Sequence, residues 1–206
     1  DGQWKLIDLG GLMLDGSVIS PANGGSITFT PVYASPELGR PMAAYLSGIS
    51  DPDDDKQIIR VAKSMDVWAL GILISKIVLG KEPTAELWKN CMSVAESGSS
   101  GEADFYHSII RYFRPRVSVG KRLAEVDPDL ADLILQMMTV DEKARATIGV
   151  LRGHRYCAKH GVYASTHPRR SSRHNRGAAA PFPNERTFFS TFRSFYANSA
   201  SLRSKM

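Results

Sequence analysis

Apolar residues are most concentrated between residues 64 and 79, where they occupy nearly every face of a helical turn. These positions are Met65, Val67, Trp68, Leu70, Ile72, Leu73, Ile74, Ile77, Val78 and Leu79. A helix that is apolar all round is typical of the centre of a domain. Ser64 is a candidate N-cap and Gly80 a candidate stop. The pattern therefore predicts a buried central helix.

Two further segments show helical periodicity, each with an apolar stripe. In the first, Phe105, Ile109, Ile110 and Phe113 recur at helical spacing before Pro115. In the second, Asp127 is a candidate cap and a first-turn proline follows it. Its apolar stripe consists of Leu130, Leu133, Ile134, Met137 and Met138. A short helix over residues 147–151 closes the pattern.

The beginning of the chain has a different pattern. Residues 3–7 favour a short strand, and residues 9–30 are rich in Gly, Ser, Thr and Pro and predict a long loop. Acidic residues gather at 48–56, and residues 97–101 favour a second flexible stretch. From His154 onward the apolar period fades, which predicts a largely disordered tail. The expected fold class is mainly α, with a short strand at its start.

Composition and charge separate the body from this tail. The chain has 206 residues, 43% of them hydrophobic, which suits one domain. Of its 26 basic and 21 acidic residues, ten basic and one acidic lie in residues 154–206, so residues 1–153 carry a net charge of −4. The body therefore gives no electrostatic reason to expect a nucleic-acid partner.

Membrane insertion and secretion are also not expected. No apolar run reaches the roughly 18–20 residues that cross a bilayer, and no signal-peptide pattern is present at the start. Cys91 and Cys157 lack disulfide or metal spacing, which favours an intracellular, cytoplasmic location.

Four motifs occur in one order along this pattern. An Asp-Leu-Gly triplet at 8–10 follows the apolar strand, and Thr-Pro-Val-Tyr-Ala-Ser-Pro-Glu occupies 30–37. Asp-Val-Trp-Ala-Leu-Gly opens the central helix at 66–71, and Asp-Glu-Lys-Ala-Arg-Ala-Thr occupies 141–147. Together they resemble the second half of a protein kinase domain, from its metal-binding triplet to its last helices. The resemblance covers about residues 3–156 and implies a helical C-terminal lobe, with a basic tail at 157–206.

The resemblance implies that Asp8 binds Mg²⁺ and that Asp8 and Ile7 contact the ATP. A carboxylate at a strand end provides the oxygen ligand that Mg²⁺ prefers, and the adjacent glycine allows a sharp turn. Taken alone, Asp8 could equally open a glycine-rich turn.

Thr30, Pro31, Val32 and Tyr33 resemble the floor that meets the peptide substrate, in a pattern closer to serine/threonine kinases than to tyrosine kinases. The preceding loop contains Ser26 and Thr28, and we expect one or the other to be the regulated phosphorylation site of the parent protein.

Two further assignments are structural. The resemblance implies that Glu37 and Arg145, 108 residues apart, form a buried bidentate ion pair, a geometry that a carboxylate and a guanidinium suit. The alternative is two independent surface charges. Asp66 is expected to anchor the catalytic-loop backbone, and its charge also complements the helix dipole.

Other candidate sites are weaker. The five histidines show no paired metal spacing, and the Gly24-Gly25 pair lacks the strand and helix of a dinucleotide site. The arginines at 169–176 could form a nuclear-import patch, but a solvated disordered run is the simpler interpretation.

Several features depart from the family. Residues 80–83 resemble the turn after the central helix, but Thr84 stands where an aromatic residue is usual, and Phe29 stands where glycine is common. The glycine-rich loop, the strand lysine and the catalytic loop lie before the metal triplet in the family order. The isolated chain is therefore expected not to transfer phosphate without the missing N-lobe.

Two functions follow from the resemblance. The first is part of a serine/threonine kinase that acts on a protein substrate. The second is a pseudokinase or kinase-derived scaffold, which would bind protein partners through its helical lobe.

Overall fold

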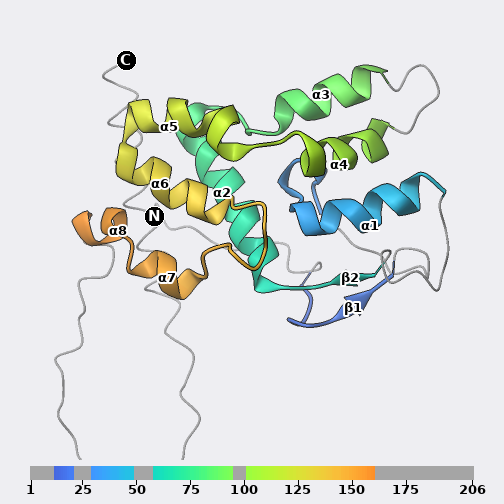
Figure 1. Ribbon diagram of the computed structural model, residues 1–206, viewed down its shortest axis with the longest axis horizontal. Coiled ribbons are helices and arrows are strands. Elements are labelled where there is room, and N and C mark those ends of the chain that lie inside the picture. The colour runs from blue at the N-terminus through green and yellow to red at the C-terminus, as the bar shows by residue number, and fades with distance from the viewer. Residues whose placement is uncertain (1–11, 21–28, 49–57, 95–100, 161–206) are drawn as a thin grey trace, which may run out of the picture. The chain divides into compact units, whose positions relative to one another are not determined.

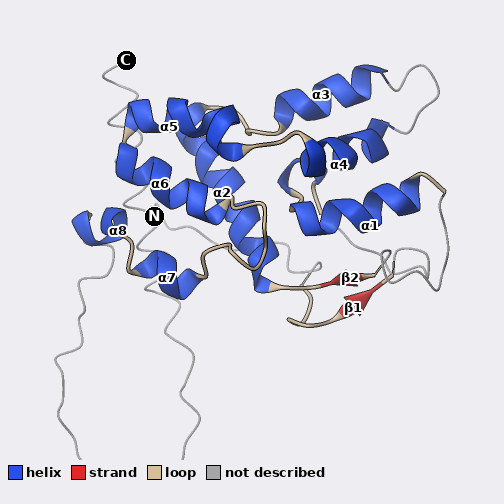
Figure 2. Cartoon of the chain, in the orientation of Figure 1, coloured by secondary structure: helices blue, strands red, loops and turns tan. Residues whose placement is uncertain are grey.

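The computed structural model describes residues 12–20, 29–48, 58–94 and 101–160 (Figure 1). The chain divides into two units, residues 8–151 and residues 1–7 with 152–206. Within the described ranges, the first unit contains nearly all of the secondary structure. It is mainly helical and carries one two-stranded sheet (Figure 2).

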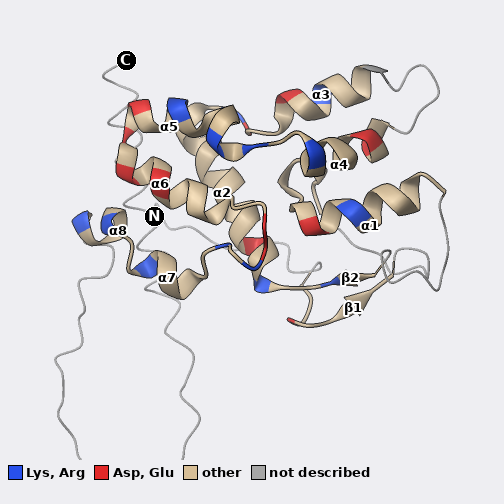
Figure 3. Cartoon of the chain, in the orientation of Figure 1, with Lys and Arg blue, Asp and Glu red and all other residues tan. Residues whose placement is uncertain are grey.

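The described elements follow one another from β1 to α8. The larger helices are α1 (Pro36–Leu46), α2 (Lys63–Leu79), α3 (Ala85–Val94), α4 (Gly101–Arg111) and α6 (Pro128–Met137). The shorter elements are β1 (Val18–Ile19), β2 (Ile59–Arg60), α5 (Lys121–Val126), α7 (Ile148–Arg152), α8 (Arg155–Lys159), a 3-10 helix (Pro31–Tyr33) and a π-helical turn (Arg116–Gly120). Several helices carry both signs of charge (Figure 3).

Helix α2 is the central helix that the apolar pattern predicts. Trp68 and Ile72 are fully buried, and the helix packs against α5 and α6. It ends at Gly80, whose φ of 81° is the left-handed conformation that glycine adopts without steric cost. The predicted N-cap at Ser64 is wrong. The cap position is Ala62, and Ser64 lies inside the first turn, because the helix begins one residue earlier, at Lys63.

Helix α6 confirms its predicted start and its apolar stripe. The Asp127 carboxylate accepts hydrogen bonds from the backbone N–H groups of Asp129 and Leu130, at 2.8 and 3.0 Å. Pro128 occupies the first helical position, where its missing N–H has no intrahelical partner to lose. All five predicted stripe residues are buried: Leu130, Leu133, Ile134, Met137 and Met138.

A glycine allows α6 to approach α2 closely. A Cβ atom placed on Gly71 would lie 2.7 Å from Met138 Cγ and 3.1 Å from Met137 Cβ. Non-bonded carbon atoms prefer separations of about 3.5–4.0 Å. Gly71 therefore leaves room for α6 to lie directly against α2.

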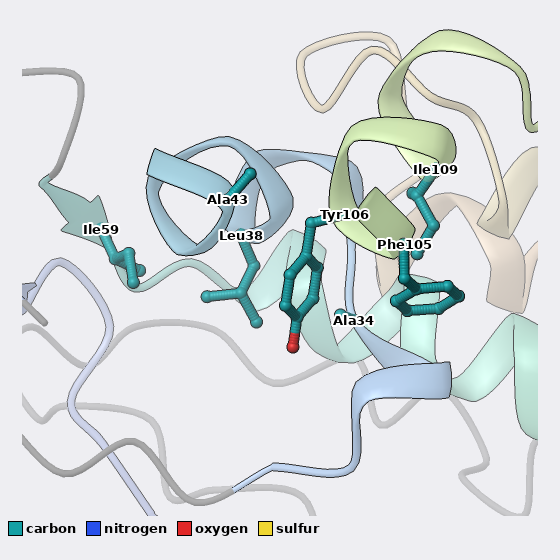
Figure 4. Packing of buried hydrophobic residues seen from close by; sticks show 7 residues of the cluster. All are labelled: Ala34, Leu38, Ala43, Ile59, Phe105, Tyr106 and Ile109. Carbon is teal, nitrogen blue, oxygen red and sulfur yellow. The ribbon is translucent and has the colours of Figure 1, made fainter. Parts of the chain in front are cut away.

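Helices α1 and α4 pack against each other around a second part of the core. Figure 4 shows the side chains of Leu38, from α1, and Tyr106, from α4, projecting in the same direction and lying side by side. The buried members of this cluster are Ala34, Leu38, Ala43, Ile59, Phe105, Tyr106 and Ile109. Phe105 also meets the Trp88 ring of α3 edge-on, with 4.9 Å between ring centroids. The predicted helix over 105–113 is thus confirmed in its first part, and α4 ends at Arg111.

The two-stranded sheet corrects one expectation. The pattern of residues 9–30 predicts a long loop, but Val18 and Ile19 form β1, which pairs antiparallel with β2. In this register Ile19 lies opposite Ile59, which is buried. Strands of two residues are too short to show the alternation that reveals strands in sequence. The predicted strand at 3–7 lies outside the described residues.

The described part of the second unit corrects another expectation. Helix α8 lies where the sequence predicts the start of a disordered tail, and it crosses the expected body–tail boundary after residue 156. His154 caps this helix, because its Nδ1 accepts a hydrogen bond from the Tyr156 N–H at 3.1 Å. Tyr156 and Cys157 are buried. None of the helices in the described ranges is long and apolar enough to cross a membrane.

Candidate functional site

The Arg145 side chain makes four hydrogen bonds to other parts of the chain. It is fully buried, and its Nε donates to the Thr139 carbonyl at 2.9 Å. Nη1 donates to the Ser64 carbonyl at 2.7 Å and to Glu37 Oε1 at 2.5 Å, and Nη2 donates to Glu37 Oε2 at 2.9 Å. The guanidinium also lies 5.1 Å from the centre of the Trp68 ring.

These contacts join three other segments of the chain to Arg145, and we call them the Arg145 hub. Glu37 lies in the first turn of α1, Ser64 in the first turn of α2, and Thr139 just after α6. Trp68 lies one turn further along α2. A buried charge is stable only when its hydrogen bonds are made, and the hub satisfies the guanidinium with a carboxylate and two carbonyl groups.

The predicted contact between Glu37 and Arg145 is therefore present in the structure. Both carboxylate oxygens are engaged, which is the fork arrangement expected of an arginine–carboxylate pair. The Glu37 side chain keeps only 13% of its surface exposed. Its place at the start of α1 also suits a negative charge, because the helix dipole is positive at that end.

Asp66 lies in the first turn of α2, as predicted, and its side chain remains in contact with solvent. Partial burial raises the pKa of the Asp66 carboxyl above its usual range. No described residue donates a hydrogen bond to this carboxylate. The anchoring of a second backbone segment by Asp66 stays a prediction.

The predicted substrate-floor residues form one turn of 3-10 helix. Tyr33 N–H donates to the Thr30 carbonyl and Ala34 N–H to the Pro31 carbonyl, both at 2.9 Å. Pro31 takes the first helical position. The segment lies between the described part of the loop and the start of α1, so its position is linked to that of Glu37.

Two residues near this turn were not singled out as site residues from the sequence. The Thr84 hydroxyl donates to the Val32 carbonyl at 2.5 Å, and the Tyr33 hydroxyl donates to Glu82 Oε1 at 3.3 Å. Lys76 Nζ lies 2.6 Å from the same Glu82 oxygen. The available signal was the departure at Thr84 from the family's aromatic residue.

The charges in this group stabilise one another. The hydrogen bond from Lys76 lowers the pKa of the Glu82 carboxyl, and the same bond raises the pKa of the Lys76 ammonium. Both groups are therefore ionised at neutral pH. Glu82 is the acceptor that links Tyr33 to the end of α2.

A hollow of about 450 Å³ lies beside the substrate-floor residues Thr30 and Tyr33. Its wall is mostly apolar and includes Ile19, Phe29, Leu38 and Met65, together with the substrate-floor residues Thr30 and Tyr33. Asp66 also lines the hollow. A volume of this size is within the range of ligand-binding clefts, about 300–1,000 Å³.

The remaining predicted site residues lie outside the described residues. These are Ile7 and Asp8, assigned to ATP and Mg²⁺, and the phosphorylation candidates Ser26 and Thr28. Within the described ranges, no group of three His, Cys, Asp or Glu side chains is placed to hold a metal ion. The metal-binding role of Asp8, which lies outside the described residues, stays a prediction.

Comparison with known proteins adds no relative to this description. No family model, no curated protein and no solved structure matches the chain.

Proposed function

We propose that the chain is the C-terminal lobe of a serine/threonine protein kinase. In the full-length parent, it would support transfer of phosphate from ATP to the hydroxyl groups of a protein substrate. The missing N-lobe would be its partner, and Asp8 with Ile7 would contact ATP and Mg²⁺. We also propose an intracellular, cytoplasmic location.

The observation that carries this proposal is the ion pair between Glu37 and Arg145. The two residues come from separate motifs, 108 residues apart, and nothing local in the sequence brings them together. The expectation that they meet came from the resemblance to protein kinases. A bidentate pair, on a fully buried guanidinium, is the contact that the kinase resemblance implies.

The secondary structure that the other motifs adopt supports the same proposal. The motif that begins at Asp66 opens the central helix α2, as the resemblance implies. The motif at 141–147 forms the turn between α6 and α7, and Arg145 of the hub lies in this turn. Residues 31–33 end two residues before Ser35, the N-cap position of α1, so the proposed substrate floor is close in sequence to Glu37 of the ion pair.

The proposed experiment begins with the complete transcript. We expect its reading frame to encode a glycine-rich loop, a strand lysine and a catalytic aspartate before Asp8. The full-length product, incubated with Mg-ATP, is expected to phosphorylate serine or threonine peptides in preference to tyrosine peptides. Asp8→Asn should abolish the transfer, because asparagine lacks the charge that holds the metal.

A matched control is Asp104→Asn, which makes the same chemical change at an exposed position of α4. This variant should keep wild-type turnover. A transcript without the upstream elements would contradict the proposal. A full-length product that folds but transfers no phosphate would favour the scaffold alternative instead.

A further inference from the structure

The side chain of Thr84 is fully buried at a helix start, where threonine usually has a different role. The Trp88 N–H donates to the Thr84 carbonyl at 2.9 Å, so Thr84 occupies the position that precedes the first turn of α3. A threonine hydroxyl there commonly accepts a hydrogen bond from the helix N–H groups. Here the hydroxyl instead donates to the Val32 carbonyl, 52 residues earlier.

A second contact joins the same two segments one residue further on. The Tyr33 hydroxyl donates to Glu82, and Lys76 holds Glu82 from the last turns of α2. The turn at 80–84 therefore reaches residues 32 and 33 at two points. We call these two contacts the 82–84 clamp.

The turn at 80–84 is more firmly held by neighbouring secondary structure than the 3-10 helix at 31–33 is. The turn at 80–84 is fixed by α2 on one side and α3 on the other. The 3-10 helix has only two backbone hydrogen bonds of its own, and all three of its residues are half-buried. Isolated turns of this kind are marginal in water. Contacts from outside must therefore determine its conformation.

We propose that Thr84 and Glu82 are positioning residues that hold residues 31–33 in the conformation in which they would meet the peptide. The contact between residues 31–33 and a peptide rests on the proposed kinase function. The role of Thr84 and Glu82 in fixing the conformation of residues 31–33 does not. Thr84 acts through its hydroxyl, and Glu82 acts through the carboxylate that Lys76 keeps ionised.

The test is amide hydrogen exchange on the full 206-residue chain, measured residue by residue by NMR. Thr84→Val keeps the side-chain volume but removes the donor. We expect the amides of Tyr33 and Ala34 to exchange about three to ten times faster, the change expected from one lost hydrogen bond of ordinary strength. Amides in α6 should keep their rates. Thr84→Ser, which retains the hydroxyl, should restore the wild-type rates.

Two variants separate positioning from general loss of stability. Thr139→Val also removes a part-buried hydroxyl, one that donates to carbonyl groups of α6, and it should leave Tyr33 and Ala34 unchanged. Glu82→Gln should accelerate exchange at Tyr33 by a smaller factor than Thr84→Val. If Thr84→Val does not fold, exchange at Tyr33 in Glu82→Gln tests the proposed positioning role instead.

Unchanged exchange at Tyr33 and Ala34 in Thr84→Val would overturn the proposal. Equal acceleration throughout the chain, or no rescue by Thr84→Ser, would overturn it as well. If Thr84→Val does not fold, unchanged exchange at Tyr33 in Glu82→Gln would have the same effect. Exchange requires no catalysis, so these outcomes are independent of whether the full-length parent transfers phosphate.

Discussion

The Arg145 hub and the 82–84 clamp hold neighbouring parts of the chain in different ways. In the hub, a fully buried guanidinium makes four hydrogen bonds to three segments. In the clamp, Thr84 is fully buried, but the Lys76 and Glu82 side chains of the supporting ion pair keep 46% and 19% of their surface exposed. The hub fixes the start of α1, and the clamp fixes the turn that precedes it.

The difference in burial determines what each region contributes. A buried charge is costly when one partner is removed, because the remaining charge stays out of water. A half-exposed ion pair is screened, and loss of one partner costs little. We therefore expect the hub to govern the stability of the fold. The clamp should govern the position of residues 31–33 while adding little to stability.

Arg145→Lys is expected to have the largest effect. Lysine keeps the charge but cannot reproduce the fork to Glu37 while also reaching the carbonyl groups of Ser64 and Thr139. Loss of a buried pair of this kind costs about 3 kcal/mol of unfolding free energy. Urea unfolding measures this loss. Arg122→Lys, on the exposed face of α5, is the matched control and should change stability by less than about 0.5 kcal/mol.

Gly71→Ala should have the next largest effect, because it disturbs the helix contact that supports the hub. The new methyl group would lie 2.7 Å from Met138 Cγ, so α2 and α6 must separate. Overpacking of this kind costs about 1–3 kcal/mol. The same substitution at Gly149, where a Cβ atom would lie 3.7 Å from Thr147 Oγ1 at an ordinary contact distance, should be neutral or slightly stabilising. Equal effects at the two glycines would contradict the close packing.

Glu82→Gln tests the clamp and should cost about 0.5 kcal/mol at neutral pH. The pKa of Glu82 is lowered in the folded chain by the hydrogen bond from Lys76. Its ionised form therefore stabilises the fold above the unfolded-state pKa, and this contribution is lost as the pH falls through the folded-state pKa. Unfolding curves of the wild type and the variant should thus converge on acidification. A difference that is constant with pH would contradict the ion pair.

Asp66→Asn should have the smallest effect, with the opposite sign. Burial raises the pKa of Asp66, so the folded chain binds a proton more readily than the unfolded chain does. Ionisation of Asp66 therefore lowers stability as the pH rises through the folded-state pKa. The variant should be more stable than the wild type at neutral pH, by less than about 0.5 kcal/mol because solvent screens the group. The difference should vanish below the unfolded-state pKa. A destabilised variant at neutral pH would show that the helix dipole outweighs burial.

Features with a strong sequence pattern or a family motif could be predicted from the sequence. The apolar run of α2 and the cap and stripe of α6 follow from residue types and spacing, whereas the pairing of Glu37 with Arg145 is what the resemblance to protein kinases implies. Arg145 could be paired with Glu37 because both lie in motifs that resemble those of the kinase family. Its hydrogen bonds to the Ser64 and Thr139 carbonyls could not be predicted, since any residue supplies a carbonyl group.

Features that depend on tertiary contacts were missed. Helix α1 contains Pro41, a residue that normally disfavours a helix interior, and its packing on α4 outweighs that preference. Strands β1 and β2 are too short for periodicity. The role of Thr84 depends on a carbonyl 52 residues away, which no local pattern indicates. In each case the sequence shows the residue but not the residue that it contacts in the folded chain.

The most direct test of the account is a double-mutant cycle on the ion pair. Unfolding free energies would be measured for the wild type, Glu37→Gln, Arg145→Met and the double variant. We predict a coupling energy of about 2–3 kcal/mol, because each single variant leaves a buried group without its partner. Additive effects, with a coupling energy below about 0.5 kcal/mol, would contradict the claim that this pair fixes the start of α1 to the helical core.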